Sequence, residues 1–416
     1  MLKKASVNSA LFEGFSEPCR DALWGHVYFT PALEAVTRTP AFSRLNRIAQ
    51  LGPASLVYPG ATHTRAAHSI GVYHIARRLI TGLCERGADS FVTAQGIRSF
   101  LCAALLHDIG HFPYAHSLKE LALTGHEQLG ARLIEADPTA SLVEKAGADP
   151  AVAAAILDTG RATDDKEVLF YRKLLSGCLD PDKLDYLNRD ARFAGVTYGT
   201  QDVDFILSRL HPSRERGVDI DSKAISSVES VLFSKYLMYR SVYWHKGVRA
   251  ATAVMKKTLH SALHDALLSP EELYNLDDNG LFDLLRKRRT AGRGKGASSS
   301  EALFDAARGL RDGKIWTCVG EVPFDEAKHH HWENREDLQC RAEAEAEISA
   351  QYGATVIIDV PERVDFETGL HVLDEDCPFE RSSTVFGAET VASFVKTLRT
   401  VRFFVDKDRG DLVYSL

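Results

Sequence analysis

The chain has 416 residues and a formal net charge of −7, so it can form one large domain with a smaller addition, or two domains. Its acidic balance gives no support for nucleic acid as the main partner. The seven cysteines are scattered and form no CxxC pair, which argues against a disulfide framework or a zinc ribbon. No signal-peptide pattern follows the first residues, and no stretch reaches the roughly 18 apolar residues of a membrane span. We therefore expect a cytoplasmic protein without a membrane-spanning segment.

Helical spacing of apolar residues dominates the first 280 residues. It predicts a helix over residues 65–83 and a strongly apolar helix over 97–109, which ends at Gly110 shortly before Pro113. Further helices are expected over 151–157, 182–193, 202–210 and 222–268.

The composition changes at residues 286–300, RKRRTAGRGKGASSS, which are basic and rich in Gly and Ser. This stretch predicts a mobile loop or linker, with a phosphate-binding arm as the alternative. Beyond it, β-branched and aromatic runs predict strands at 315–322, 354–360 and 400–406, and a helix is expected at 388–398. The predicted fold is therefore mainly α, with a helical body over 1–285, the basic loop over 286–300, and a C-terminal α+β region over 301–416.

Seven of the 16 histidines lie between residues 63 and 126. In LLHDIGHFPYAH, residues 105–116, an apolar helix delivers His107 and Asp108 side by side. An imidazole and a carboxylate together suit Mn, Fe, Co, Zn or Mg with oxygen co-ligands. Because burying Asp108 without a cation would be costly, the pair predicts a metal nearby.

Two further candidate ligands come from other segments. His68 lies on the earlier helix, and Asp182 lies in LDPDKLDYLNRD. Asp180 precedes Pro181 and is the expected helix cap. Asp182 alone is explained equally well as a solvated acid in the first helical turn.

Five ordered segments and their flanks resemble the HD-domain superfamily, and within it the dNTP triphosphohydrolase branch. They are RLNRIAQLG (44–52), YPGATHTRAAHSIGV (58–72), ALLHDIGHFPYAH (104–116), GHEQ (125–128) and DPDKLDYLNRDARFAGV (180–196). The resemblance implies a helical HD-domain body and metal-dependent hydrolysis of deoxynucleoside triphosphates to deoxynucleoside and triphosphate. It also implies a homo-oligomer.

The resemblance assigns one divalent metal ion (Mn, Mg, Fe, Co or Zn) to four ligands, namely His68, His107, Asp108 and Asp182. Such a set leaves open positions for water and a phosphate oxygen. The same resemblance places His111, His116 and His126 near the scissile phosphate. His116 would then act as a general acid, and Glu127 would orient His126.

Substrate contacts are implied in the same way. Arg65 and Lys183 would grip phosphates, while Gln50, Tyr186 and Asp190 would meet the sugar 3′-hydroxyl and Leu51 its C2′ side. In VYWHKGVRAA, residues 242–251, the further cations are His245, Lys246 and Arg249. Spacing puts His245 and Arg249 on one helical face, with a solvated cationic face as the alternative.

Several positions depart from the family pattern. Lys119, followed by Glu120, replaces an acidic residue after His116, and Ala251 replaces an aromatic residue that senses the sugar. Arg38, Ser43 and Asn46 replace the residues that read an activating guanine nucleotide, so we expect no GTP activation of that kind.

These departures leave two alternatives open. One is an HD phosphohydrolase that acts on another nucleotide or a phosphodiester, and the other is a nucleotide-binding regulator with weak turnover. The histidines at 329–331 lie in a polar stretch and are expected at an exposed loop or helix end.

Overall fold

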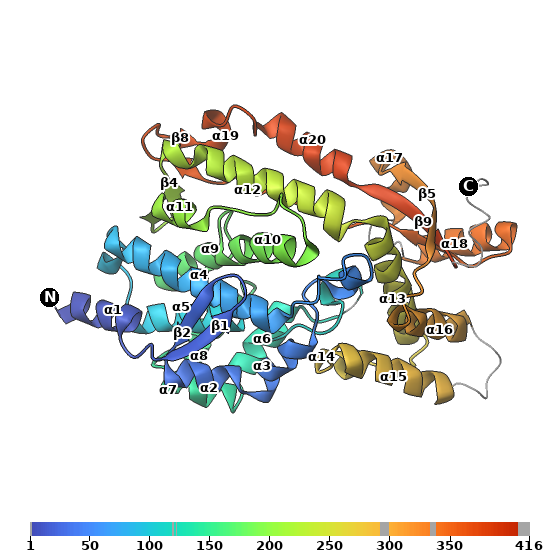
Figure 1. Ribbon diagram of the computed structural model, residues 1–416, viewed down its shortest axis with the longest axis horizontal. Helices are drawn as coiled ribbons and strands as arrows, with labels where there is room; N and C mark the ends of the chain where they lie inside the picture. The colour runs from blue at the N-terminus through green and yellow to red at the C-terminus, as the bar shows by residue number, and fades with distance from the viewer. Residues whose placement is uncertain (1, 119, 122, 292–298, 333–337, 407–416) are drawn as a thin grey trace.

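The computed structural model describes residues 2–118, 120–121, 123–291, 299–332 and 338–406, and helices make up most of them (Figure 1). The predicted mainly α fold with a smaller α+β part is confirmed. None of the described helices is both long and apolar enough to cross a membrane.

The helical body is built around α4 (Arg65–Glu85) and α5 (Ala94–Leu106), which pack against each other, while α10 (Pro181–Ala194) packs on α4. Apolar residues of α5 are buried along its whole length, as its continuous apolar sequence predicts. The other helices of this part are α1 (Leu2–Phe12), α2 (Pro31–Thr37), α3 (Pro40–Arg44), α6 (His126–Ile134), α7 (Thr139–Lys145), α8 (Pro150–Leu157), α9 (Lys166–Leu175) and α11 (Val203–Ser208).

Helix α10 begins and ends as its sequence predicts. The Asp180 side chain accepts a hydrogen bond from Lys183 N at 2.6 Å, and Pro181 occupies the first turn. Gly195 ends the helix with a φ of +72°, a conformation that favours glycine. These caps fix the position of the first turn, which carries Asp182.

The predicted helix over 222–268 is interrupted. It forms α12 (Ile225–Met238), a π-helical turn at Tyr239–Tyr243, and α13 (Lys246–His264). A π-helical turn adds a residue to the helical repeat and is frequent near functional sites. The chain continues through α14 (Pro270–Tyr274), α15 (Asp278–Ala291) and α16 (Ser299–Arg311).

The predicted basic loop at 286–300 is shorter than expected. Helix α15 continues to Ala291 and α16 begins at Ser299, so only residues 292–298 fall outside the described residues. Leu281 and Leu285 anchor α15 in a second core cluster, and the Arg-Lys run that follows is compatible with helix.

Three small sheets accompany the helices. A hairpin of β1 (Glu17–Asp21) and β2 (Gly25–Phe29) was not predicted from the sequence. An antiparallel sheet has the order β5-β9-β6, with β5 at Thr317–Pro323, β6 at Val356–Asp359 and β9 at Thr400–Val405, close to the three predicted strands. A third sheet has the order β3-β4-β7-β8, formed by Leu210–Ser213, Gly217–Ile220, His371–Val372 and Cys377–Pro378.

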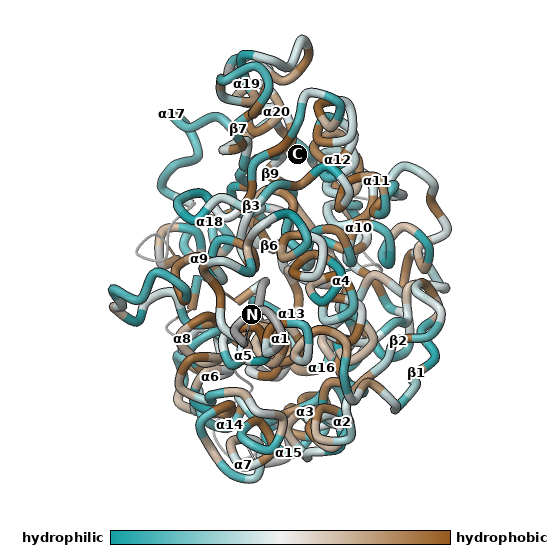
Figure 2. Tube along the Cα trace, turned by 90° about the vertical axis from the view of Figure 1, so that its left-hand side faces the viewer, coloured by the Kyte–Doolittle hydropathy of each residue, from teal (hydrophilic) through white to brown (hydrophobic). Residues whose placement is uncertain are grey.

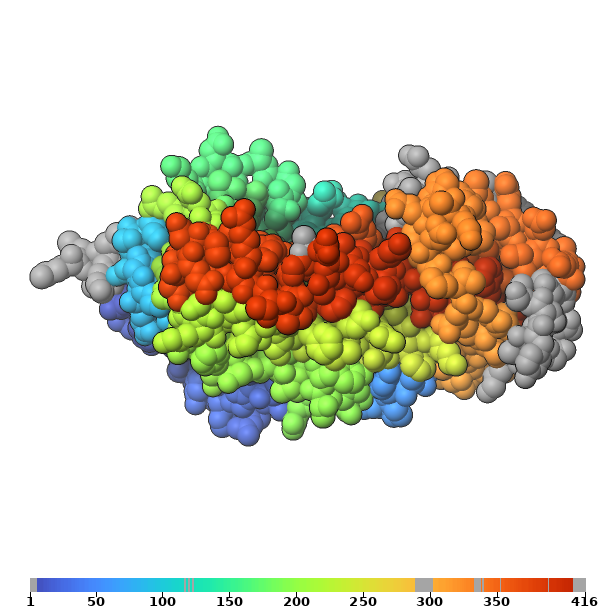
Figure 3. All heavy atoms as spheres, turned by 90° about the horizontal axis from the view of Figure 1, so that it is seen from above, coloured from blue at the N-terminus to red at the C-terminus, as the bar shows by residue number. Residues whose placement is uncertain are grey.

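The C-terminal region shares a core with the helical body. Strand β7 pairs in parallel with β4, and Val364, Phe366 and Leu370 belong to the same apolar cluster as α4 and α5. Helix α20 (Ala388–Leu398) lies along α12, where Phe394 stacks on Tyr236 at 4.5 Å between ring centroids (Figures 1 and 3). The division of the chain at residues 285 and 301 stays a prediction.

The remaining helices of the region are α17 (Glu326–His329), α18 (Leu338–Tyr352) and α19 (Phe379–Ser382). The segment around α17 is hydrophilic (Figure 2). Its last residue, His329, begins the histidine run, which therefore lies at a helix end as predicted.

A buried ion pair fastens the C-terminal sheet to α13. Asp359 of β6 accepts hydrogen bonds from Nε and Nη2 of Arg249 at 2.8 and 2.6 Å, and both residues are buried. Burial alone would raise the pKa of Asp359, but the Arg249 guanidinium lowers it. The pair therefore stays ionised in the interior.

We predict that Asp359→Ala lowers the free energy of unfolding by about 3–5 kcal/mol, because it leaves a buried guanidinium without its counter-charge. Urea denaturation measures the change. The control is Asp204→Ala, which removes the exposed ion pair with Arg78 and should cost less than about 1 kcal/mol. Equal effects of the two substitutions would contradict the role of the buried pair.

Candidate metal centre

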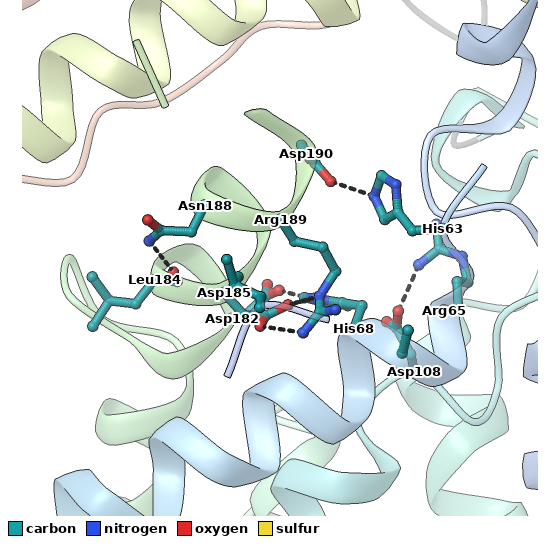
Figure 4. Close-up of polar contacts among 12 residues, drawn as sticks. His63, Arg65, His68, Asp108, Asp182, Leu184, Asp185, Asn188, Arg189 and Asp190 are labelled. Carbon is teal, nitrogen blue, oxygen red and sulfur yellow. Dashed lines mark hydrogen bonds and ion pairs between the residues drawn. The ribbon is translucent and has the colours of Figure 1, made fainter. Parts of the chain in front are cut away.

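Three helix ends meet at one cavity of about 650 Å³. Figure 4 shows His68, Asp108 and Asp182, which lie on them. His68 comes from the first turn of α4, Asp182 from the first turn of α10, and His107 and Asp108 from the C-terminal end of α5. All four line the cavity. The structure therefore brings together the four residues that the sequence predicts as ligands.

Ligand atoms of His68, His107 and Asp182 lie within 4.8 Å of one another, as expected for ligands of one ion, while Asp108 groups in the same way with His111 and His126. His68 Nε2 is 3.2 Å from His107 Nε2 and 2.9 Å from Asp182 Oδ1. His107 Nε2 is 3.4 Å from Asp108 Oδ1 and 3.9 Å from Asp182 Oδ1. Ligands held about 2.1 Å from a small divalent cation lie roughly 3 Å or more apart.

The outer nitrogen of each imidazole fixes its tautomer. His68 Nδ1 lies 2.8 Å from Asp185 Oδ2, and His107 Nδ1 lies 3.0 Å from the carbonyl oxygen of Ala104. Both oxygens only accept, so both Nδ1 atoms donate. The two Nε2 atoms are then left to face each other and the neighbouring carboxylates, a position where a proton or a metal cation supplies positive charge.

Without a metal ion, a proton on His68 Nε2 supplies this positive charge. Burial lowers the pKa of His68, but hydrogen bonds to Asp182 and Asp185 outweigh it and raise the pKa to about 10. The negative groups around His68 thus favour positive charge at Nε2. The donor set and its electrostatics fit a divalent metal ion, whose identity they do not select.

Asp185 holds His68 in place. Its buried carboxylate also accepts hydrogen bonds from Trp24 Nε1 at 2.5 Å and from Nε and Nη2 of Arg189 at 2.8 and 2.9 Å. Arg189 in turn donates to Asp21 at 2.9 Å. Every hydrogen bond to Asp185 limits the rotation of the carboxylate that orients His68.

Gly71 provides the space for this network. A Cβ at residue 71 would overlap the Asp185 carboxylate and the Arg189 guanidinium. Gly71 lies one helical turn after His68, so a residue with a side chain there would displace the group that orients the imidazole. The sequence analysis missed Trp24, Gly71 and Asp185 as parts of the site.

Asp108 links this group to a second histidine pair. Its Oδ1 lies 3.1 Å from His111 Nε2, and its Oδ2 accepts a hydrogen bond from Arg65 Nη1 at 2.6 Å. The His111 ring stacks on that of His126 at 3.8 Å between centroids. Burial and the charge of Arg65 hold the pKa of His111 well below its usual range, which favours a neutral imidazole.

The structure describes only some of the predicted partners of these histidines. Glu127 Oε1 lies 3.3 Å from His126 Nε2, within the range of a weak ion pair. The side chain of His116 and all of Lys119 lie outside the described residues. Glu120 accepts hydrogen bonds from Lys256 at 2.8 Å and Arg341 at 2.5 Å, so it fastens this loop to α13 and α18.

Most of the predicted substrate residues line the cavity, namely Gln50, Leu51, Arg65, Lys183, Tyr186, Asp190 and Arg249. Gln50 Oε1 and Arg65 Nε are buried and have no hydrogen-bond partner in the described part of the chain. One is an acceptor and the other a donor, so a polar ligand in the cavity has groups to meet.

Three of the cations that line the cavity are paired with carboxylates. Arg65 pairs with Asp108 and Arg249 with Asp359, while Lys183 Nζ lies 2.7 Å from Asp180 and 2.8 Å from Glu367. Asp190 is also engaged, because it contacts His63 at 2.8 Å and accepts from Tyr243 Oη at 2.6 Å. The polar groups of the cavity are therefore ordered by the protein itself.

His245 and Lys246 do not line the cavity. His245 caps α13 instead, because its Nδ1 accepts a hydrogen bond from Gly247 N at 3.2 Å. The helical face that reaches the cavity carries Val248, Arg249 and Thr252. The predicted pairing of His245 with Arg249 on one cavity-facing surface is thus replaced by a capping role.

Other residues that line the cavity were not predicted. Lys235, Tyr239, Tyr243 and Trp244 come from the end of α12 and the π-helical turn, and Glu362 and Glu367 come from the C-terminal region. The π-helical turn, which sets the direction of these aromatic side chains, has no signal in the sequence.

Comparisons with known proteins agree with this architecture. Residues 65–167 match the family model of the HD domain, and residues 202–404 match that of the HD-associated region. The chain is 37% identical over 232 residues to the uncharacterized protein YwfO of Bacillus subtilis, covering 55% of this chain and 52% of that protein. It is 45% identical over 96 residues to the deoxynucleoside triphosphate triphosphohydrolase SAMHD1 of Danio rerio, covering 23% and 15%.

The aligned segment spans about half the length of YwfO. Two solved structures share the fold over nearly the whole chain. A hypothetical protein from Aquifex aeolicus has a TM-score of 0.72 at 25% identity, covering 96% of this chain and 99% of that one. A phosphohydrolase from Bacteroides thetaiotaomicron has a TM-score of 0.70 at 24% identity, covering 94% and 100%. The chain carries an HD domain and an HD-associated region and so belongs to the HD-domain superfamily, and part of it is similar to a deoxynucleoside triphosphate triphosphohydrolase.

Proposed function

We propose that this chain is a metal-dependent phosphohydrolase that converts deoxynucleoside triphosphates to deoxynucleoside and triphosphate. The observation that carries the proposal is the pair of facing Nε2 atoms of His68 and His107, flanked by Asp182 and Asp108, in a cavity of about 650 Å³. A cavity of this size suits a nucleotide. The similarity to enzymes named as deoxynucleoside triphosphate triphosphohydrolases supports the substrate class.

The ligands in this proposal are His68, His107, Asp108 and Asp182. A bound divalent ion supplies a Lewis acid that withdraws charge from a phosphoryl oxygen. Hydrogen bonds within the chain hold the proposed ligands in position. Asp185 and the Ala104 carbonyl hold the two imidazoles, and Arg65 holds the outer oxygen of Asp108.

Proton transfer falls to the second group of histidines. The stacked rings of His111 and His126 lie beside Asp108, and His126 lines the cavity. His116 is proposed as the general acid that protonates the departing 5′-oxygen of the sugar, with Glu127 orienting His126. General acid catalysis of this kind contributes typically about 10²–10⁴-fold to the rate.

The sugar is proposed to lie against Gln50, Leu51, Tyr186 and Asp190. The unpaired Oε1 of Gln50 can accept from a hydroxyl group, and Leu51 offers an apolar surface to the C2′ side. Asp190 is held by His63 and Tyr243, so its position is set before substrate enters. A homo-oligomeric state and a cytoplasmic location stay predictions.

We expect the metal-free protein to be inactive, and added Mn²⁺, Mg²⁺ or Co²⁺ to restore hydrolysis. The test incubates each of the four dNTPs and four NTPs with the protein and each metal, and identifies the products by ³¹P NMR. Deoxynucleoside and inorganic triphosphate are the expected products. Nucleoside monophosphate as the main product would contradict the proposal in favour of another HD phosphohydrolase, and binding without turnover would favour a regulator.

We predict that Asp185→Asn weakens metal binding by about 10–100-fold, because the substitution alters the partner that orients His68. Isothermal titration of metal-free protein with Mn²⁺ measures the affinity directly, without turnover. Trp24→Phe removes only one hydrogen bond to Asp185 and should have a smaller effect. Asp204→Asn, at the exposed pair with Arg78, is the control and should bind Mn²⁺ like the wild type. An unchanged affinity in folded Asp185→Asn would contradict this role.

A further inference from the structure

The segment of residues 361–370, between β6 and β7, brings the C-terminal region to the cavity. It has no helix or strand, yet Val364, Phe366 and Leu370 are buried in the main core. Two residues of the same segment, Glu362 and Glu367, line the cavity. The buried apolar residues thus anchor a segment that presents carboxylates to the cavity.

The same segment contacts both lysines among the described residues that line the cavity. Glu367 Oε2 lies 2.8 Å from Lys183 Nζ. Two residues earlier, the backbone carbonyl of Asp365 accepts a hydrogen bond from Lys235 Nζ at 2.6 Å. The Lys235 ammonium also lies 5.4 Å from the centroid of the Phe366 ring. Residues 365–367 therefore occupy the two ammonium groups that an anionic ligand would otherwise meet.

The two carboxylate partners of Lys183 differ in how firmly they are held. The Asp180 side chain is 3% exposed and caps α10 through Lys183 N, so the fold fixes it. The Glu367 side chain is 46% exposed and comes from a segment without regular secondary structure. Of the two, Glu367 is the partner that a ligand can replace.

The charge of the cavity makes such a replacement necessary for a polyphosphate. Carboxylates outnumber the Lys and Arg side chains among the described lining residues. A triphosphate adds further negative charge close to Glu367, where partial burial limits screening by solvent. Its phosphate oxygens can pair with Lys183 only where the Glu367 carboxylate gives way.

We propose that Glu367 is a specificity-determining residue that competes with a phosphate of the substrate for Lys183. The inference rests on the proposed function in taking the ligand to be a polyphosphate. The Glu367 carboxylate keeps Lys183 neutralised in the empty cavity and lowers the affinity for any ligand that needs this ammonium group. Removing the charge of Glu367 without changing its shape therefore strengthens polyphosphate binding.

The test is isothermal titration of the full chain with inorganic triphosphate in the presence of Mg²⁺. Glu367→Gln should tighten triphosphate binding by about 3–10-fold, the range expected when a partly exposed ion pair no longer competes. Asp365→Asn is the matched control, since it removes a carboxylate two residues away whose side chain pairs with Arg363 and does not line the cavity. The triphosphate affinity of Asp365→Asn should stay within about twofold of the wild type, as expected for a charge at the edge of a binding site. Unchanged affinity in Glu367→Gln, or no triphosphate binding by either protein, would overturn the proposal.

The same substitution in a Lys183→Met variant distinguishes competition for Lys183 from general electrostatic repulsion by Glu367. In Lys183→Met the ammonium group is absent, so adding Glu367→Gln should no longer tighten triphosphate binding. An equal gain in both backgrounds would show that Glu367 acts only through its field and would overturn competition for Lys183. The outcome is independent of turnover: if dNTPs yield no triphosphate but Glu367→Gln still tightens its binding, the proposed function fails and this inference stands. Normal turnover with unchanged triphosphate affinity would reject this inference alone.

Discussion

Two buried imidazole nitrogens that face each other at 3.2 Å are the constraint on which the site depends. Their outer nitrogens donate to Asp185 and to a backbone carbonyl, so neither ring can turn away without losing a buried hydrogen bond. Two carboxylates beside them add negative charge. Positive charge between the rings offsets the excess of buried anions. The Asp185 network and the space left by Gly71 keep this geometry in place.

Asp108 connects the two facing imidazoles to other side chains of the cavity. One of its oxygens faces both His107 and His111, and the other is held by Arg65. The proposed metal group and the stacked pair of His111 and His126 therefore share one carboxylate. A change at either group alters the electrostatics of the other, since all these residues are close and largely buried.

The C-terminal region takes part in the site through three connections. The Arg249–Asp359 pair fixes α13, Glu120 joins its loop to Lys256 and Arg341, and residues 365–367 hold the two cavity lysines. The cavity is thus lined by residues of both the HD domain and the HD-associated region.

Motif order and local chemistry explain what the sequence predicted. The positions of His68, His107, Asp108 and Asp182 follow from helix ends with recognisable caps and flanks, and the strands from β-branched runs. Contacts between distant residues left no such pattern. Trp24 is 161 residues from Asp185, and the segment that carries Glu367 has no periodicity to mark it as part of a cavity wall.

In two places the local sequence pattern predicted a different structure from the one observed. Composition alone favoured a loop at residues 286–291, where the apolar face of α15 imposes a helix. His245 has the spacing of a ligand, yet it caps α13 because the π-helical turn before it changes the direction of the chain.

If one divalent ion lies between the two facing imidazoles, crystals grown with Mn²⁺ and measured above and below the manganese absorption edge will reveal it. We expect one strong anomalous peak within coordination distance of His68 Nε2, His107 Nε2 and Asp182. No peak at this position, or a peak only at sites away from these three groups, would contradict it.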